Sequence, residues 1–298
     1  PHCNKSVITD QNDIFRDGLF YCATKLYGIT LTQIKNVPLP HPEAPAFEVK
    51  DAKGKHIAIL FMDFFPRASK RGGAWCGTYR DQTYEKGKKI TPVVTIVCNF
   101  TKPAAGEPAL LTADEASTMF HEFGHALHQF FQDVHYQGIS NVPRDFVELP
   151  SQINEHWCFA PEVLKVYAKH YKTGEIMPQS LVEKMERSQK YGQGFATVEY
   201  VAASLLDMDW HVLKSVPDDL DVEDFERQTL VKRGLLSQIP PRYRTTYFNH
   251  TMGGGYTAGY YSYMWAEVLE ADGFEAFKET GDIFNQDVAN RFRKYVLT

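Results

Sequence analysis

The feature that most constrains this fold is a pair of histidines, four residues apart, in a segment with the pattern of an amphipathic helix. Thr112 and Glu115 have the spacing of a capping box, which predicts the helix start. At 100° per residue, His121 and His125 lie about 40° apart and one turn along the axis. Two imidazoles on one face can bind one Zn²⁺ at roughly 2.0–2.1 Å. Glu122 lies beside them, where its carboxylate can take a proton from metal-bound water.

A third metal ligand is expected elsewhere, because a catalytic zinc usually has three protein ligands and one position for water. His128 is about 10 Å from His121 along the axis, too far to share its metal, so we interpret it as a packing histidine. No HxxGxxH extension follows the pair, and the remaining candidates are acidic: Asp133, Asp145, Glu148 and Glu155. Glu148 stands among apolar neighbours, where a carboxylate is costly to bury without a cation. Spacing alone leaves Glu148 and Glu155 as alternatives.

A second polar group surrounds the glycine-rich tract Met252–Tyr256, which we expect to be a flexible loop able to close over a substrate. The group consists of His250, Tyr256, Tyr260, Tyr261 and Tyr263. Hydroxyl and imidazole groups can donate hydrogen bonds to the oxyanion of a tetrahedral intermediate. In the alternative interpretation, Tyr260, Tyr263 and Trp265 form an apolar core stripe at helical spacing.

The composition excludes several classes of protein. With 32 basic and 37 acidic residues the formal charge is −5, whereas proteins that bind nucleic acid or membrane surfaces carry a basic excess. The longest apolar stretch, Ile57–Met62, is far shorter than a membrane-spanning helix requires. Five cysteines, Cys3 among them, show no CxxC spacing and favour a reducing compartment. We therefore expect a cytoplasmic protein, with the periplasm as the alternative. Separately, both ends of the sequence look cut from a longer chain.

The order of the predicted elements indicates a mainly α fold with a small antiparallel sheet near the N-terminal end. Helical spacing covers residues 13–27, and a proline-rich loop covers Val37–Pro45. Strands are expected at Ile57–Phe65, Ala74–Tyr79 and Val93–Asn99, and further helices at 145–172, 178–190, 195–215, 222–234 and 257–279. Residues 1–110 would thus form a helix and sheet above a helical zinc-binding body, 111–298, in one continuous domain.

Several long motifs point to a known family. HEFGHALH is followed by RDFVELPSQINEHW from Arg144 to Trp157 and by FNHTMGGGYTAGYYSYMW from Phe248 to Trp265. KPAAGEPALL from Lys102 and PPRYR from Pro240 agree with them. Over nearly its whole length the chain resembles the thimet oligopeptidase family of zinc metallopeptidases, and within it the bacterial dipeptidyl carboxypeptidase branch, which has the GGGY spacing.

The resemblance implies a helical, zincin-like catalytic domain with one zinc ion per chain. It implies that His121, His125 and Glu148 bind the zinc, with Glu122 as general base. It also implies roles on the substrate for the polar group near the glycines: His250, Tyr256, Tyr260 and Tyr263. The segment Gly73–Tyr79 resembles the family's edge strand, which pairs with the substrate backbone. Family members are much longer, so a helical N-terminal lobe is expected to be missing here.

We therefore expect a zinc peptidase acting on short peptides, with no nucleic-acid or membrane partner. Release of C-terminal dipeptides requires a group that binds the free carboxylate, and arginine suits this through bidentate hydrogen bonds. Arg242 and Arg244 are the two candidates. One alternative is an endo-acting oligopeptidase with the same chemistry. Another is a non-catalytic zinc- or peptide-binding fragment, although a structural zinc has no use for the base Glu122.

Overall fold

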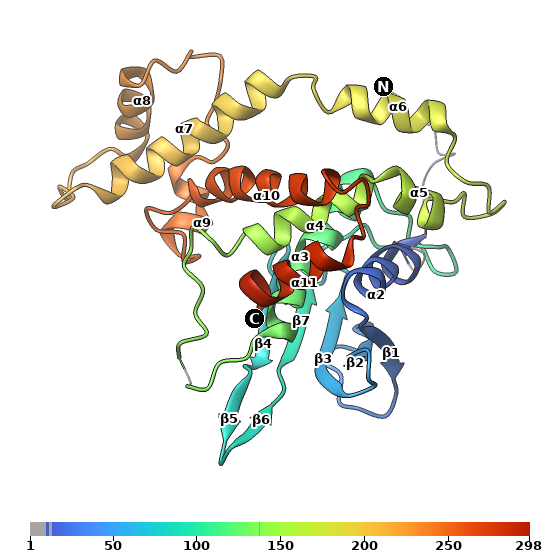
Figure 1. The fold of residues 1–298 in the computed structure, drawn as a ribbon. Coiled ribbons are helices and arrows are strands. Elements are labelled where there is room, and N and C mark those ends of the chain that lie inside the picture. Colours follow the sequence, from blue (N-terminus) through green and yellow to red (C-terminus); the bar gives the residue numbers. More distant parts are fainter. Residues whose placement is uncertain (1–9, 12–13, 137) are drawn as a thin grey trace. The chain divides into compact units, whose positions relative to one another are not determined.

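The structure is a computed structural model that describes residues 10–11, 14–136 and 138–298, so Cys3 and Asp13 lie outside the described residues. Figure 1 shows its elements. The strands are β1 (Thr30–Ile34), β2 (Ala46–Lys50), β3 (His56–Asp63), β4 (Trp75–Arg80), β5 (Thr83–Glu85), β6 (Lys88–Ile90) and β7 (Val93–Val97). The α-helices are α2 (Tyr21–Tyr27), α3 (Ala113–Phe131), α4 (Leu149–Phe159), α5 (Pro161–Tyr167), α6 (Gln179–Ser188), α7 (Gln193–His211), α8 (Val222–Lys232), α9 (Asn249–Met252), α10 (Ser262–Lys278) and α11 (Gln286–Phe292). The prediction of a mainly α fold is confirmed.

The chain forms two compact units. The first comprises the described residues up to Val142, together with Leu149–Pro178 and Glu267–Thr298. The second comprises Pro143–Glu148 and Gln179–Ala266. The boundary expected at residue 110 stays a prediction. Among the described residues, no helix has the length and apolar character needed to cross a membrane.

The larger sheet of the first unit has the strand order β1-β2-β3-β7-β4. Strands β3 and β7 are parallel, with Ile59 opposite Val93, and the other neighbouring pairs are antiparallel. Parallel neighbours need a crossover connection, and here β4 and the β5–β6 hairpin lie between them in the chain. The sheet is therefore mixed, which corrects the expectation that it is antiparallel throughout. Strand β4 forms one of its edges.

Strands β3, β4 and β7 match the three predicted strands, whereas β1 and β2 were not expected. The β1 sequence TLTQI has three exposed residues and no buried one, because it forms the other edge of the sheet. Such a short, polar edge strand has no apolar run from which periodicity could identify it.

Helix α3 is the centre of the first unit and begins where the capping box predicts. The backbone N–H of Glu115 donates to Oγ1 of Thr112 at 3.2 Å, and the Glu115 carboxylate accepts from the Thr112 N–H at 2.8 Å. Its apolar face is buried, with Met119 and Phe120 fully inaccessible to solvent. Asn154 of α4 donates to the Phe120 carbonyl at 2.6 Å, which ties the two helices together.

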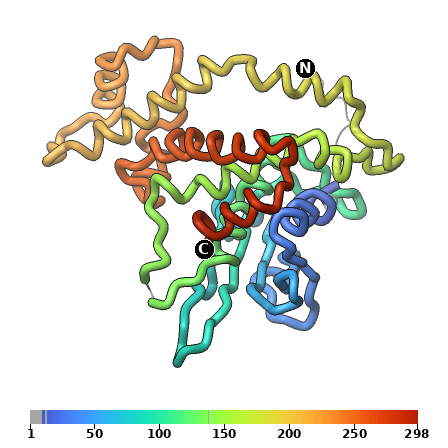
Figure 2. Tube along the Cα trace, viewed as in Figure 1, coloured from blue at the N-terminus to red at the C-terminus, as the bar shows by residue number. Residues whose placement is uncertain are grey.

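The predicted helix 145–172 is wrong in its extent, because the structure has two helices, α4 and α5, with a break at Ala160. Proline at position 161 is the first residue of α5, where its missing N–H is not needed. A proline inside a continuous helix would remove a hydrogen bond and clash with the preceding turn. The C-terminal end returns to the start of the same unit: Gln286 of α11 donates to the Lys25 carbonyl of α2 at 2.6 Å (Figure 2).

The second unit contains helices α6 to α9 and the first turn of α10. One apolar cluster joins α7 to α8 through Leu206 and Leu230, with Trp210 packed against them. Another joins α7, through Ala203, to Phe248 just before α9 and to Tyr260 after it. Helix α7 is thus the support on which the glycine- and tyrosine-rich segment is built.

Candidate active site

Helix α3 presents the histidine pair as its spacing predicts. The rings of His121 and His125 have centroids 5.1 Å apart and are nearly perpendicular, at 84°. Both imidazoles are partly accessible, whereas Glu122 between them in sequence is only 5% exposed. The helix therefore carries two nitrogen donors and one buried carboxylate within a single turn.

Glu148 completes a group with metal-ligating chemistry. Glu148 immediately precedes Leu149, the first residue of α4, and its side chain is buried. One ligand atom from each of His121, His125 and Glu148 lies within 4.8 Å of the other two. Two imidazoles and a carboxylate are a donor set that catalytic zinc uses. This geometry fits a metal ion.

Glu155, the alternative to Glu148, is not part of this three-residue group but contacts one of its histidines. Its carboxylate accepts a hydrogen bond from Nδ1 of His121 at 2.7 Å and another from the Ser117 hydroxyl at 2.9 Å. A carboxylate on the far nitrogen of a ligating histidine fixes the ring and its tautomer. Sequence reasoning treated Glu155 only as a ligand; its position about one turn before the end of α4, facing α3, is the signal that it missed.

The other sequence candidates lie apart from this group. His128 is 7% exposed, and burial together with His125 lowers its pKa to about 4, which agrees with its interpretation as a packing residue. Asp133 accepts from the Tyr84 hydroxyl at 2.9 Å and pairs with Lys89. Asp145 accepts from the Tyr261 hydroxyl at 3.4 Å.

In the second unit, the predicted histidine and tyrosines form one cluster. The ring of His250 lies 5.5 Å from Tyr260, 6.0 Å from Tyr256 and 6.2 Å from Tyr263. Tyr256 and Tyr263 stack at 5.1 Å. Tyr260 is 3% exposed and belongs to the apolar cluster, so the core interpretation holds for this ring, whereas Trp265 is 49% exposed.

The electrostatics of this cluster favour hydrogen-bond donors. The Tyr256 hydroxyl donates to the Glu148 carboxylate. Burial and the charge of Glu148 raise the pKa of both Tyr256 and Tyr263, so these hydroxyls keep their protons at neutral pH. Burial and the nearby Arg242 lower the pKa of His250, which favours its neutral form. The Arg144 guanidinium lies over the Tyr256 ring, 4.4 Å from its centroid, in a cation–π contact.

The two candidate arginines differ in their partners. Arg244 is paired with the buried carboxylate of Glu226, whose other oxygen accepts from the Thr245 N–H at 2.8 Å. Arg242 instead interacts with Tyr243 and Tyr260, and, together with burial, its charge lowers the pKa of His250. Arg242 is thus the arginine that belongs to the tyrosine cluster.

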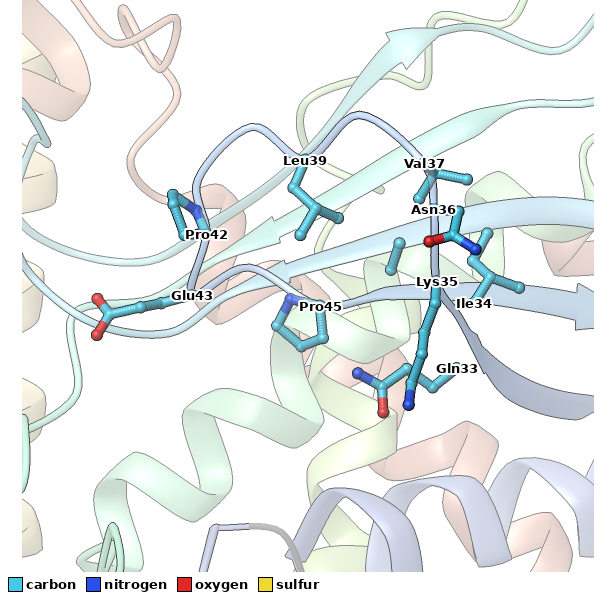
Figure 3. A pocket seen from close by; sticks show the side chains of 10 residues that line it. Gln33, Ile34, Lys35, Asn36, Val37, Leu39, Pro42, Glu43 and Pro45 are labelled. Carbon is cyan, nitrogen blue, oxygen red and sulfur yellow. The ribbon is translucent and has the colours of Figure 1, made fainter. Parts of the chain in front are cut away.

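A cavity of about 410 Å³ lies elsewhere in the first unit, at the connection between β1 and β2 (Figure 3). It is lined by residues between Gln33 and Ala46, with Lys35 and Glu43 as its charged side chains. Glu43 is already paired with Lys102 at 2.7 Å. None of the candidate site residues lines this cavity, so it is not part of the candidate active site.

Comparison with known proteins agrees with the site. The chain is 44% identical over 290 residues to the dipeptidyl carboxypeptidase of Escherichia coli K12, and 37% identical over 289 residues to oligopeptidase A of the same organism. It is 32% identical over 288 residues to a thimet-like oligopeptidase of Dictyostelium discoideum. These alignments cover 94–96% of this chain but 42% of each relative, so the chain spans less than half of their length. Residues 11–298 match the pattern that defines Peptidase family M3, and the chain therefore belongs to this family.

Proposed function

We propose that this chain is a zinc-dependent peptidase that hydrolyses short peptides and releases C-terminal dipeptides. The observation that carries the proposal is the His121, His125 and Glu148 group, with Glu122 on the same helix as both imidazoles. Membership of Peptidase family M3 and the 44% identity to a dipeptidyl carboxypeptidase support it. One zinc ion per chain is proposed because one such three-residue group is found in the part of the chain that the structure describes.

In this proposal α3 supplies two of the metal ligands and the general base, and Glu148, the residue before α4, supplies the third ligand. His121, His125 and Glu148 hold the zinc ion, which when bound supplies a Lewis acid that polarises a peptide carbonyl and acidifies water. Glu122 takes the proton of the attacking water and passes it to the leaving amine.

The tyrosine cluster supplies hydrogen bonds to the substrate. We assign the stabilisation of the oxyanion to the hydroxyls of Tyr256 and Tyr263, with the His250 imidazole as a further donor. Tyr260 packs against His250 and holds its ring. The outer edge of β4 offers backbone groups with which an extended peptide can pair.

The test of the function is the product pattern from an N-blocked peptide of about ten residues incubated with zinc-loaded protein. Mass spectrometry should show successive loss of C-terminal dipeptides. Internal cuts would instead support the endo-acting oligopeptidase, as in the relative named oligopeptidase A. No cleavage by protein that binds one zinc ion would support the non-catalytic fragment.

Arg242 is proposed as the anchor for the substrate's terminal carboxylate, and Arg242→Ala tests this. Because a hydrogen bond to a charged group contributes about 1.5–3 kcal/mol, KM for a free-acid peptide should rise at least about tenfold. A C-terminally amidated peptide serves as the control, since its KM should be the same for both proteins. Arg244→Ala should instead lower the melting temperature, because it leaves buried Glu226 without its cation. A free-acid KM unchanged by Arg242→Ala would refute the anchor.

Glu155 is proposed to orient His121, so Glu155→Ala should weaken zinc binding by about 10- to 100-fold. Competition with a chelating dye measures this affinity. Glu162→Ala, at an exposed position of α5, is the matched control and should bind zinc as the unmodified chain does. Equal affinities for the two variants would show that the hydrogen bond to His121 has no part in metal binding.

A further inference from the structure

A buried carboxylate of α7 has no role in the proposed chemistry. Asp207 is completely inaccessible to solvent, although it lies one turn before the end of a helix whose last residues are partly exposed. Burying a charged carboxylate is costly unless hydrogen bonds compensate for the lost hydration. Its partners therefore show what the residue is for.

These partners lie in the turn that carries the tyrosines. One carboxylate oxygen accepts from the Ala258 N–H at 3.0 Å, and the other accepts from the Tyr260 N–H at 3.0 Å. Nδ1 of His211, one helical turn further along α7, lies 2.9 Å from the first oxygen and 2.8 Å from the backbone carbonyl oxygen of Asp207. Asp207 thus holds two backbone groups on either side of Gly259.

The turn needs such an anchor. Ala258 has a φ of 51°, in the left-handed region that a residue with a side chain rarely adopts. Backbone hydrogen bonds connect this turn to the tyrosine cluster. The Tyr256 N–H donates to the His250 carbonyl at 2.8 Å, and the Tyr256 carbonyl accepts from the Gly259 N–H at 2.8 Å. A change in the backbone at Ala258 would therefore rotate the rings beside it.

A second contact from α7 supports the same segment. Tyr200 lies two turns before Asp207, on the same helix face, and its hydroxyl donates to the Tyr260 carbonyl. The Met264 N–H donates to that hydroxyl at 3.3 Å, at the start of α10. Helix α7 thereby fixes both the N–H and the carbonyl of Tyr260.

We infer that Asp207 is a positioning residue for the tyrosine cluster: its carboxylate fixes the turn from Thr257 to Tyr260 and so aligns Tyr256, Tyr263 and His250 on the substrate. The inference rests on the proposed peptidase function. It predicts that loss of the carboxylate lowers kcat, because a misplacement of about 1 Å in a catalytic group can reduce the rate about 100-fold.

Asp207→Asn tests the inference, because the amide keeps the size of the side chain but offers one acceptor in place of two. We expect kcat to fall about 10- to 100-fold, with KM changed less than about threefold and zinc content unchanged. Asp209→Asn is the matched control: it lies on the same helix, pairs with Arg233 at 2.7 Å and should keep the parent kcat.

Hydrogen exchange makes the anchor visible independently of activity. The amides of Ala258 and Tyr260 should be protected in the parent chain and exchange faster in Asp207→Asn, whereas the amides of α3 should not change. A kcat within twofold of the parent, or unchanged exchange at both amides, would overturn the inference.

If Asp207→Asn does not fold, His211→Gln weakens the same carboxylate contact and should lower kcat in the same direction. A parent chain that cleaves no peptide would contradict the proposed function, while the exchange data would still report on the anchor.

Discussion

Glu122→Gln should reduce peptide hydrolysis by about 10²- to 10⁴-fold while leaving zinc binding intact. The amide has nearly the same size as the carboxylate but cannot accept the proton of the attacking water, and general base catalysis contributes a factor of this order. Glu122 is not among the three residues that form the metal-ligating group. Product mass spectrometry gives the rate, and metal analysis of the purified variant gives the zinc content.

The matched control for this variant is Glu115→Gln, on the same helix. Glu115 is the third residue of the capping box, where glutamine is also found, so the helix start should survive with a stability loss of about 1 kcal/mol or less. We expect its kcat to equal that of the parent. Hydrolysis by Glu122→Gln at the parent rate would contradict the assigned base, and loss of zinc from this variant would assign Glu122 to the metal instead.

The sequence could predict the elements in which local signals agree. Helix α3 has a capping box, an apolar stripe and the HExxH spacing, and all three act within one segment. The break between α4 and α5 could not be placed from apolar spacing alone, since that spacing continues across Pro161. Strand β1 could not be identified because its pairing with β2, and not its composition, makes it a strand.

The site shows the same division between local and long-range information. The two imidazoles come from residues four apart, whereas spacing left Glu148 and Glu155 as alternatives until their contacts with α3 separated them. Asp207 is still further from its partners, at 51 and 53 positions in the chain. An acidic residue in a helix carries no local sign that it accepts from a distant turn, so only the folded structure reveals this anchor.

Gly124→Ala should be the most destabilising single change in the motif. A Cβ atom at Gly124 would lie 2.2 Å from the Pro150 carbonyl oxygen and 2.6 Å from Cα of Ser151. Both are backbone atoms of α4, so no side chain can move aside and the two helices must separate. Overpacking typically costs about 1–3 kcal/mol, and we expect at least the upper end of this range here because backbone must shift. Urea denaturation measures the loss of unfolding free energy.

Zinc affinity should fall together with stability, since α4 begins at the residue after Glu148 and must move away from the histidine pair. Gly194→Ala in α7 is the matched control, because nothing lies within 4 Å of its added Cβ. Alanine favours a helix over glycine by about 1 kcal/mol, so this variant should be as stable as the parent or more so. If Gly124→Ala unfolded at the same urea concentration as Gly194→Ala, α3 and α4 would not be in the close contact that brings Glu148 to the histidines. The small residue inside HEFGH is thus explained by packing: it permits the helix approach on which the proposed metal group depends.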